Sequence, residues 1–197
     1  LREGLAEDPY YMERLYADFF GFGTGGHSDE FVRFVNDSTI FLAWPVIDDF
    51  ADLTLATENQ RRMQENLEII EETTDWRGKK FTVVRIPQPV LFYKTEIPDD
   101  ETRNFLIAQD TSLILEERQT IKIVACANYL NFVMTDRLIV LPEYWDPSVP
   151  EIQKERDSVV GEIFAQFLPQ YRIVRINPMS LNFAGGGMHC QCFSLPK

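Results

Sequence analysis

The sequence predicts an α/β protein built from a repeated strand–strand–helix–strand unit. Two observations lead to this prediction. Hydrophobic patterns typical of two strands, a helix and a further strand occur twice in the same order. In addition, the last strand of each copy ends in similar residues, Val83–Pro87 and Ile173–Pro178, with Arg85 and Arg175 in the same place. Repeats of this kind are arranged around an axis or along a line.

No low-complexity tract or linker interrupts the chain, so we expect a single domain over residues 1–197. The repeat units are expected at about 27–90 and 120–178, with the start of another at 179–197.

A helix is predicted before the first unit. Asp8-Pro9 is typical of an N-cap followed by proline in the first turn. Apolar side chains follow at helical spacing from Met12 to Phe19. The glycines of Gly21–Gly26 then end the helix and form a loop.

The first unit begins with a hairpin. Its two strands are Glu30–Val35 and Thr39–Trp44, joined at Asn36–Ser38. Thr57–Trp76 is amphipathic and predicts a helix. Phe81–Ile86 predicts the closing strand, which the following prolines stop.

The second unit repeats this order. Tyr129–Thr135 and Arg137–Leu141 predict a hairpin, Pro150–Leu168 a helix, and Tyr171–Ile176 a strand. Between the two units the pattern is less regular, and two elements are predicted there. Pro98–Glu101 caps a short helix, and Ser112–Leu115 forms a strand.

Composition limits the classes of partner. The formal net charge of −12 argues against binding a phosphate backbone and is compatible with a cationic substrate. No stretch approaches the roughly 20 apolar residues that span a bilayer. The cysteines, Cys126, Cys190 and Cys192, are too few and odd in number for a disulfide framework, which favours a reducing, cytoplasmic setting. Cys190 and Cys192 are too close and too isolated for a zinc ribbon, so no metal site is predicted.

Two glycine segments lead into residues with catalytic chemistry. One ends in His27-Ser28-Asp29-Glu30, and the other, Gly185–Gly187, leads to His189-Cys190. Each segment is expected to enter a strand, so that His27 and Asp29 face one side. A thiolate can attack the carbon of a guanidinium, a carboxylate can bind that planar cation, and an imidazole can carry protons. Cys190, Asp29 and His27 match these three roles.

Simpler interpretations of the same residues stay open. A single Cys at the end of a strand is commonly a small buried hydrophobe, and a His-x-Asp sequence commonly makes surface hydrogen bonds. A glycine triplet is commonly only a turn. Two other enzyme classes are disfavoured, because neither a P-loop lysine with its helix nor a Gly-x-Ser-x-Gly motif occurs.

These residues resemble the agmatine deiminase and bacterial peptidylarginine deiminase-like family. The resemblance covers most of the chain and is carried, in the family's order, by Gly26–Val35, Gln64–Ile70, Val83–Pro87, Ala127–Phe132 and Gly185–Cys190. It implies the pentein fold, a five-bladed α/β propeller with a central active site. The chain would then be the C-terminal part of a deiminase propeller, with only part of the five-fold ring present.

The resemblance also implies roles for individual residues. Cys190 would be the nucleophile and His27 the general acid/base, while Asp29 binds the guanidinium. Asn131 and the glycines Gly186 and Gly187 would shape the substrate pocket. The implied reaction converts agmatine to N-carbamoylputrescine and ammonia through a covalent thiouronium, with no metal or organic cofactor.

Alternatives within this resemblance are a peptidylarginine or arginine deiminase, an amidinotransferase and an inactive homologue. The sequence departs from the family at Gly25, where an acidic or amide residue is usual, and in its longer segment Lys94–Thr120. No counterpart of the family's second guanidinium-binding aspartate precedes His27. The expected partners are therefore a small cationic guanidino substrate and the rest of the propeller, in the same gene product or another chain. Assembly into a homo-oligomer is a further option, and no nucleic acid or membrane is expected.

Overall fold

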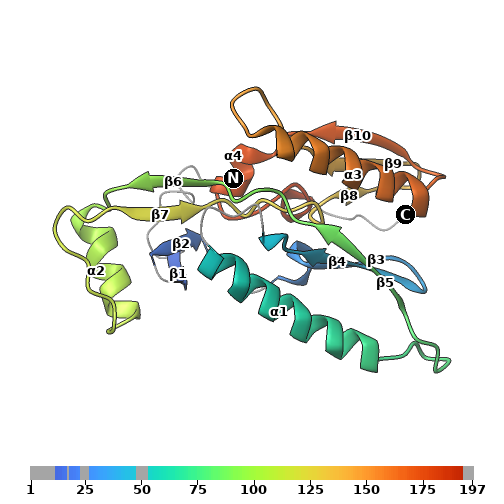
Figure 1. The fold of residues 1–197 in the computed structure, drawn as a ribbon, viewed down its shortest axis with the longest axis horizontal. Coiled ribbons are helices and arrows are strands. Elements are labelled where there is room, and N and C mark those ends of the chain that lie inside the picture. Colours follow the sequence, from blue (N-terminus) through green and yellow to red (C-terminus); the bar gives the residue numbers. More distant parts are fainter. Residues whose placement is uncertain (1–11, 17, 23–26, 48–52, 193–197) are drawn as a thin grey trace. The chain divides into compact units, whose positions relative to one another are not determined.

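A computed structural model describes residues 12–16, 18–22, 27–47 and 53–192, and its elements are drawn in Figure 1. Contacts within the chain group these residues into two compact units, which we describe one at a time. Unit 1 draws on the described residues within 1–26, 91–127 and 179–186, and unit 2 on those within 27–90, 128–178 and 187–197. The single domain expected from the sequence stays a prediction. Within the described ranges, no helix is both long enough and apolar enough to cross a bilayer.

The first part of unit 2 contains a hairpin, a helix and a strand in the predicted order. Strand β3 (Val32–Asn36) pairs antiparallel with β4 (Thr39–Trp44), and β4 pairs in parallel with β5 (Thr82–Pro87). Helix α1 (Leu53–Glu72) makes the crossover between the two parallel strands. These strands form a three-stranded sheet in the order β3-β4-β5.

The second part of unit 2 has the same topology. Strand β8 (Val133–Met134) pairs antiparallel with β9 (Leu138–Pro142), which pairs in parallel with β10 (Arg172–Ile176) after helix α3 (Glu151–Phe167). Both predicted hairpins, both helices and both closing strands are therefore present, but the strand predicted at Tyr129–Thr135 is reduced to Val133–Met134. The mixed sheets confirm the predicted α/β class.

Arg85 and Arg175, which match in the two strand endings, each contact the end of the neighbouring parallel strand. The guanidinium of Arg85 lies over the ring of Trp44, with 4.0 Å from its central carbon to the ring centroid. In the other copy, Nη1 of Arg175 lies 2.9 Å from Oε1 of Glu143. Each arginine thus reaches the end of the parallel strand beside it, by a cation–π contact in one copy and an ion pair in the other.

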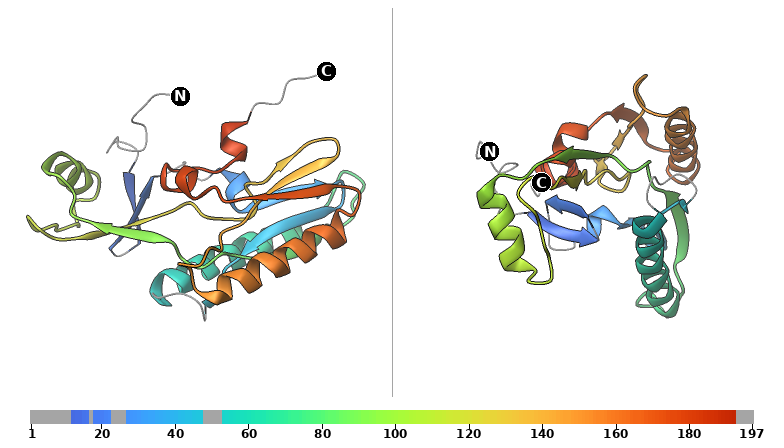
Figure 2. Two further views of the ribbon diagram at one scale, coloured as in Figure 1. Left: turned by 90° about the horizontal axis from the view of Figure 1, so that it is seen from above. Right: turned by 60° about the vertical axis from the view of Figure 1, so that its left-hand side comes forward.

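Aromatic packing joins the two parts of unit 2. The ring of Phe41, in β4, lies 5.1 Å from that of Phe164 and 5.7 Å from that of Phe167, both at the end of α3. Phe132 packs edge-on against Phe164 at 5.0 Å. Helix α3, orange in Figure 2, therefore also covers the sheet of the first copy. Edge-to-face pairs at these distances are favourable beyond the burial of their area.

Unit 1 is built on a four-stranded sheet in the order β1-β2-β7-β6. Its strands are β1 (Met12–Tyr16), β2 (Phe19–Phe22), β6 (Tyr93–Glu96) and β7 (Ile121–Val124). Strands β2 and β7 are parallel, and the other two pairs are antiparallel.

The helix predicted from Met12 to Phe19 is wrong, because this segment is the hairpin β1-β2. Pairing with β7 buries Phe20 and Phe22 in a core shared with Ile121 and Ile123. That long-range burial outweighs a local spacing that fits a helix equally well. The predicted cap at Asp8-Pro9 and most of the glycine loop lie outside the described residues.

Helix α2 (Asp100–Gln109) begins as predicted, since the Asp99 side chain accepts a hydrogen bond from the N–H of Thr102 at 2.7 Å. The strand predicted at Ser112–Leu115 is wrong. Its burial does alternate, with Leu113 and Leu115 buried around an exposed Ile114, but the segment pairs with no other strand of the described residues.

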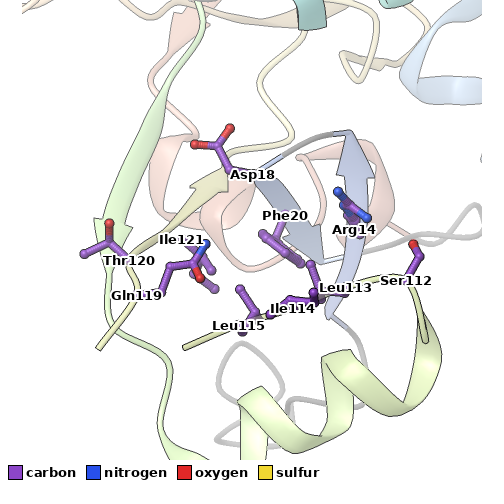
Figure 3. A pocket seen from close by; sticks show the side chains of 10 residues that line it. All are labelled: Arg14, Asp18, Phe20, Ser112, Leu113, Ile114, Leu115, Gln119, Thr120 and Ile121. Atoms are coloured by element: carbon purple, nitrogen blue, oxygen red, sulfur yellow. The ribbon is translucent and has the colours of Figure 1, made fainter. Parts of the chain in front are cut away.

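This segment forms one wall of a pocket of about 300 Å³ in unit 1, shown in Figure 3. Buried Phe20 and Leu115 are among its apolar lining, and exposed Arg14 and Asp18 are among its polar lining. Arg14 is paired with Asp110 at 2.8 Å, and Asp18 with Lys122 at 3.0 Å.

The start of a third repeat was predicted at 179–197. Within it, the structure describes a short helix, α4 (Met179–Phe183), and a single 3₁₀ turn at His189–Gln191. The strand expected after the glycines is not formed there. Residues 193–197 lie outside the described part of the chain.

Candidate active site

One half of the site is a 3₁₀ turn, Ser28–Glu30, in unit 2. The N–H of Glu30 donates to the carbonyl of His27 at 3.3 Å, which closes the turn. The prediction that a strand places His27 and Asp29 on one face is wrong, because β3 begins only at Val32. Successive residues of a 3₁₀ helix are about 120° apart. The turn therefore allows the neighbouring carboxylates of Asp29 and Glu30 to reach one cluster.

The other half is the 3₁₀ turn His189–Gln191, which also belongs to unit 2. Nδ1 of His189 lies 2.6 Å from Oδ2 of Asp29. Sγ of Cys190 lies 3.3 Å from Oε1 of Glu30 and 4.0 Å from Oδ2 of Asp29. Two turns that are far apart in the sequence thus meet through four chemically active side chains.

Asn131 joins the two turns and is buried. Its Nδ2 group lies 3.0 Å from both Asp29 Oδ2 and Glu30 Oε1, and 3.2 Å from the sulfur of Cys190. Its Oδ1 accepts hydrogen bonds from the backbone N–H groups of His189 at 2.7 Å and Cys190 at 3.4 Å. One amide therefore holds both carboxylates, the thiol and the second turn.

Asn128 holds both Glu30 and Asn131 in place by hydrogen bonds. Its Nδ2 group donates to Oε2 of Glu30, and its Oδ1 accepts from the N–H of Asn131 at 2.8 Å. The hydroxyl of Tyr144 accepts from the N–H of Asn128 at 3.0 Å and donates to its carbonyl at 2.8 Å. The backbone of Asn128 is thus clamped by one buried hydroxyl.

Asp157, a buried residue of α3, anchors the far end of this network. Its carboxylate accepts hydrogen bonds from the Tyr129 hydroxyl at 2.6 Å, Gln153 Nε2 at 2.9 Å and the backbone N–H of Tyr144 at 3.1 Å. Burial, and then the charge of Asp157, raise the pKa of Tyr129, so its hydroxyl remains a donor.

Burial and neighbouring charges raise the pKa values of two groups in the cluster, Glu30 and Cys190. Burial raises the pKa of Glu30, and the neighbouring charge of Asp29 raises it further. Partial burial also raises the pKa of the Cys190 thiol, and its contact with Glu30 adds to that rise. Hydrogen bonds from the backbone of Gly187 and from Asn131 act on the thiol in the opposite direction. Before substrate binds, the sulfur is therefore a thiol at neutral pH.

Arg33 supplies a fixed positive charge near the acids. Its Nη1 donates to the carbonyls of Leu130 at 3.1 Å and Phe132 at 3.2 Å, and its guanidinium lies 4.5 Å from the centre of the Phe132 ring. Burial lowers the pKa of Arg33, while the charge of Asp29 raises it. The cation therefore fixes the backbone on both sides of Asn131 rather than serving as an open anion site.

The structure brings together most of the site residues expected from the sequence. Cys190, Asp29 and Asn131 are in contact, and Gly187 packs against Asn131. His27 is exposed, and within the described part of the chain its imidazole makes no hydrogen bond to Cys190 or Asp29. Its charge nevertheless lowers the pKa of Glu30.

Gly186 belongs to unit 1 and is not part of this cluster. Its carbonyl accepts a hydrogen bond from Nδ2 of the buried Asn182 at 2.9 Å.

Three residues of the cluster were given no role by the sequence. Glu30 and His189 were noticed only as neighbours of Asp29 and Cys190, because strand alternation turns adjacent residues to opposite faces. Asn128 precedes Asn131 by three positions. The signals that could have found them are the adjacent Asp-Glu pair and this Asn spacing, both beside a glycine segment.

Comparisons with known proteins agree with one another. Residues 14–196 match the family described as Porphyromonas-type peptidyl-arginine deiminase. An agmatine deiminase of Pseudomonas fluorescens is 28% identical over 192 residues, which are 96% of this chain and 45% of that protein.

Solved structures share the fold. An agmatine deiminase of Enterococcus faecalis, described as catalyzing its reaction, aligns with a TM-score of 0.56 at 19% identity, covering 84% of this chain and 39% of that one. A C. jejuni agmatine deiminase aligns with a TM-score of 0.52 at 15% identity, covering 93% and 54%. The chain spans about half the length of the relatives it matches. Because the family match extends over nearly the whole sequence, the chain belongs to the Porphyromonas-type peptidyl-arginine deiminase family.

Proposed function

We propose that the protein containing this chain hydrolyses the guanidinium group of a small cationic substrate, most specifically agmatine, to a ureido product and ammonia. The observation that carries the proposal is the position of the Cys190 sulfur, 3.2 Å from Asn131 Nδ2 and 3.3 Å from Glu30 Oε1, beside the carboxylate of Asp29. A nucleophile next to two carboxylates suits a planar cation whose carbon is to be attacked. The relatives that are named agmatine deiminase favour agmatine as that cation.

Asp29 is the residue best placed to bind the guanidinium. Among the described residues, every hydrogen bond of its carboxylate falls on Oδ2, from His189, Asn131 and, at 4.0 Å, the sulfur of Cys190. Its Oδ1 is therefore available to a ligand. A carboxylate oxygen held in place by its partner oxygen loses little conformational freedom when it binds a cation.

Cys190 acts as the nucleophile. Its sulfur attacks the guanidinium carbon, a C–S bond forms, and one amino group leaves as ammonia after it gains a proton. This leaves a covalent thiouronium, which water then attacks; the C–S bond breaks and the ureido product departs. A substrate cation beside the sulfur favours the thiolate, which compensates for the raised pKa of Cys190 before substrate binds.

His27 is the proposed general acid/base for ammonia and water. Its exposed imidazole leaves it free of competing side-chain partners among the described residues. His189 is less suited to this role, because its Nδ1 is engaged by Asp29 at 2.6 Å. No step requires a metal or an organic cofactor.

We further propose that the units described above are parts of a five-bladed propeller. The chain spans 45% of the agmatine deiminase of P. fluorescens, so the remaining blades lie in sequence outside this chain or in another chain. They would supply a second carboxylate to the guanidinium. The proposed setting is cytoplasmic, because cysteines this few and odd in number are not typical of a disulfide framework.

The test is product formation by the full-length protein. Agmatine, free arginine and a blocked arginyl peptide are supplied separately, and ureido product is measured for the wild type and for Cys190→Ser. We expect turnover with agmatine, an adduct on Cys190 by mass spectrometry after rapid acid quench, and no turnover in the variant. Full turnover by Cys190→Ser would contradict the mechanism. Transfer to an added amine, rather than to water, would instead identify an amidinotransferase.

A further inference from the structure

We propose that Glu30 is a further catalytic residue, whose carboxylate accepts the proton of the Cys190 thiol as the sulfur attacks. The inference deepens the proposed function and rests on it. Its geometric basis is the 3.3 Å separation between Cys190 Sγ and Glu30 Oε1, in which the thiol is the donor. This distance is within the range of hydrogen bonds that involve sulfur.

Glu30 is fixed in this position by two amides. Asn131 Nδ2 donates to Oε1 at 3.0 Å, and Asn128 Nδ2 donates to Oε2. An amide N–H group donates but does not take up a proton. These contacts therefore hold the carboxylate toward the sulfur without competing for the thiol proton. They also prevent Glu30 from turning toward solvent, so the carboxylate keeps the same distance before and during attack.

No other base of the described cluster is as well placed. Asp29 Oδ2 is 4.0 Å from the sulfur and already accepts from Asn131 and His189. His27 makes no hydrogen bond to the sulfur within the described ranges. Two residues therefore transfer different protons. Glu30 accepts the proton of the thiol, and the imidazole of His27 donates to ammonia and accepts from water.

The charges around the sulfur explain why the thiol proton moves to Glu30 only when substrate is bound. Asp29 and Glu30 face the thiol, while His27, His189 and Arg33 act on these two acids. Partial burial raises the pKa of Cys190 and the contact with Glu30 raises it further, so before substrate binds the proton stays on the sulfur. A guanidinium cation beside the sulfur favours the thiolate and leaves the proton on Glu30.

The step balances without a further reactant. The S–H bond breaks and an O–H bond forms on Glu30, while the sulfur electron pair forms the C–S bond. The electrons of one C–N double bond move onto nitrogen. When the C–S bond breaks at the end of the cycle, the thiolate recovers the proton from Glu30.

The experiment compares Glu30→Gln and Glu30→Asp with the wild type of the full-length protein, and Glu155→Gln, an exposed acid on α3, is the control. Two readouts are measured across pH: steady-state turnover of agmatine, and the rate at which neutral iodoacetamide alkylates Cys190. Removing a general base costs on the order of 10²-fold or more. We therefore expect Glu30→Gln to lose about 10²-fold in kcat at neutral pH and to recover part of it at alkaline pH, where the thiol ionises unaided.

Alkylation reports the same contact without requiring turnover. Because Glu30 raises the pKa of Cys190, the alkylation profile of Glu30→Gln is expected to move to lower pH, whereas that of Glu155→Gln stays in place. Glu30→Asp retains a carboxylate and should keep the shape of the wild-type turnover profile with a lower kcat. An unmoved alkylation profile, or a loss in Glu30→Gln that is equal at every pH, would overturn the proposal. Absence of ureido product from the wild type would refute the proposed function, while the alkylation profile would still test the Glu30–Cys190 pair.

Discussion

Gly187 lies so close to Asn131 that a Cβ atom on Gly187 would stand 2.3 Å from Oδ1 of that side chain and 2.6 Å from its Cγ. Such distances are far inside van der Waals contact, so only glycine fits here. The amide that Gly187 accommodates is the same one that contacts the sulfur and both carboxylates. Because Gly187 has no Cβ atom, it leaves room for the Asn131 side chain at the site.

Gly187→Ala is predicted to displace Asn131 and impair the cluster. We expect a destabilisation of about 1–3 kcal/mol from overpacking, and a loss of about 10²-fold in agmatine turnover from misplacement of the reacting groups. Urea unfolding and ureido product formation measure the two effects. Gly78→Ala is the control for backbone strain without overpacking. At Gly78 the φ is +77°, so alanine is strained there, but its Cβ would meet no atom within 4 Å. Equal turnover in Gly187→Ala and wild type would contradict the close packing.

Asn131→Ala is predicted to raise the pKa of Cys190. The Nδ2 group of Asn131 donates to the sulfur at 3.2 Å and stabilises the thiolate, so its loss favours the thiol. The alkylation profile of Cys190 with iodoacetamide should shift to higher pH, opposite in direction to that of Glu30→Gln. Asn104→Ala, at an exposed position of α2, should leave the profile unchanged. A shift to lower pH in Asn131→Ala would rule out the hydrogen bond as a stabilising contact.

Asp157→Ala is predicted to be among the most destabilising single substitutions in unit 2. Its buried carboxylate accepts from Tyr129, Gln153 and the backbone of Tyr144, and these donors would be left without their acceptor. Each unsatisfied buried donor costs about 1–3 kcal/mol. We expect a loss of about 3 kcal/mol or more in the free energy of unfolding, read from urea titration.

Two variants calibrate this network. Tyr144→Phe removes the hydroxyl that pairs with both the N–H and the carbonyl of Asn128 and should cost about 2 kcal/mol or more. Glu155→Ala, exposed on the same helix as Asp157, should change stability by less than about 0.5 kcal/mol. If Asp157→Ala is no less stable than Glu155→Ala, the network does not anchor the site.

The stability of the protein should depend on pH through Glu30. Its folded pKa is raised above the usual 4.5 by burial and by Asp29. Below that usual value both states are protonated and Glu30 costs nothing. As pH rises, the unfolded state loses its proton first, so the free energy of unfolding falls through the window up to the raised folded pKa.

Glu30→Gln removes this dependence. The variant should be more stable than the wild type at neutral pH, and the difference should shrink as pH falls below about 4.5. Urea titrations at several pH values measure it, with Glu155→Gln as the matched control. A wild type that exceeds the variant in stability at neutral pH would show that Glu30 is not under electrostatic strain. The substitution that abolishes the proposed proton transfer would thus stabilise the fold.

Local sequence patterns were sufficient for the elements whose signals lie within one segment. The period of α1 and α3, the hairpin around Asn36–Ser38 and the cap at Asp99 all depend on neighbouring residues, and all three are present. The hairpin β1-β2 was predicted as a helix, because Met12, Leu15, Tyr16 and Phe19 fit that spacing as well. Strand β7, which pairs with β2, is about a hundred residues away in the sequence, so no pattern within the segment itself indicates this pairing.

The sequence by itself determined which segments we propose to carry the chemistry, since His27-Ser28-Asp29-Glu30 and His189-Cys190 are distinctive residues at distinctive glycine segments. Only the tertiary structure decided which of them meet. Two 3₁₀ turns, where strands were predicted, place Glu30 at the sulfur of Cys190 and leave His27 exposed. The reason is geometric: a strand alternates its side chains by 180°, whereas a 3₁₀ turn advances them by about 120°, so a change in local conformation changes which neighbour reaches the thiol.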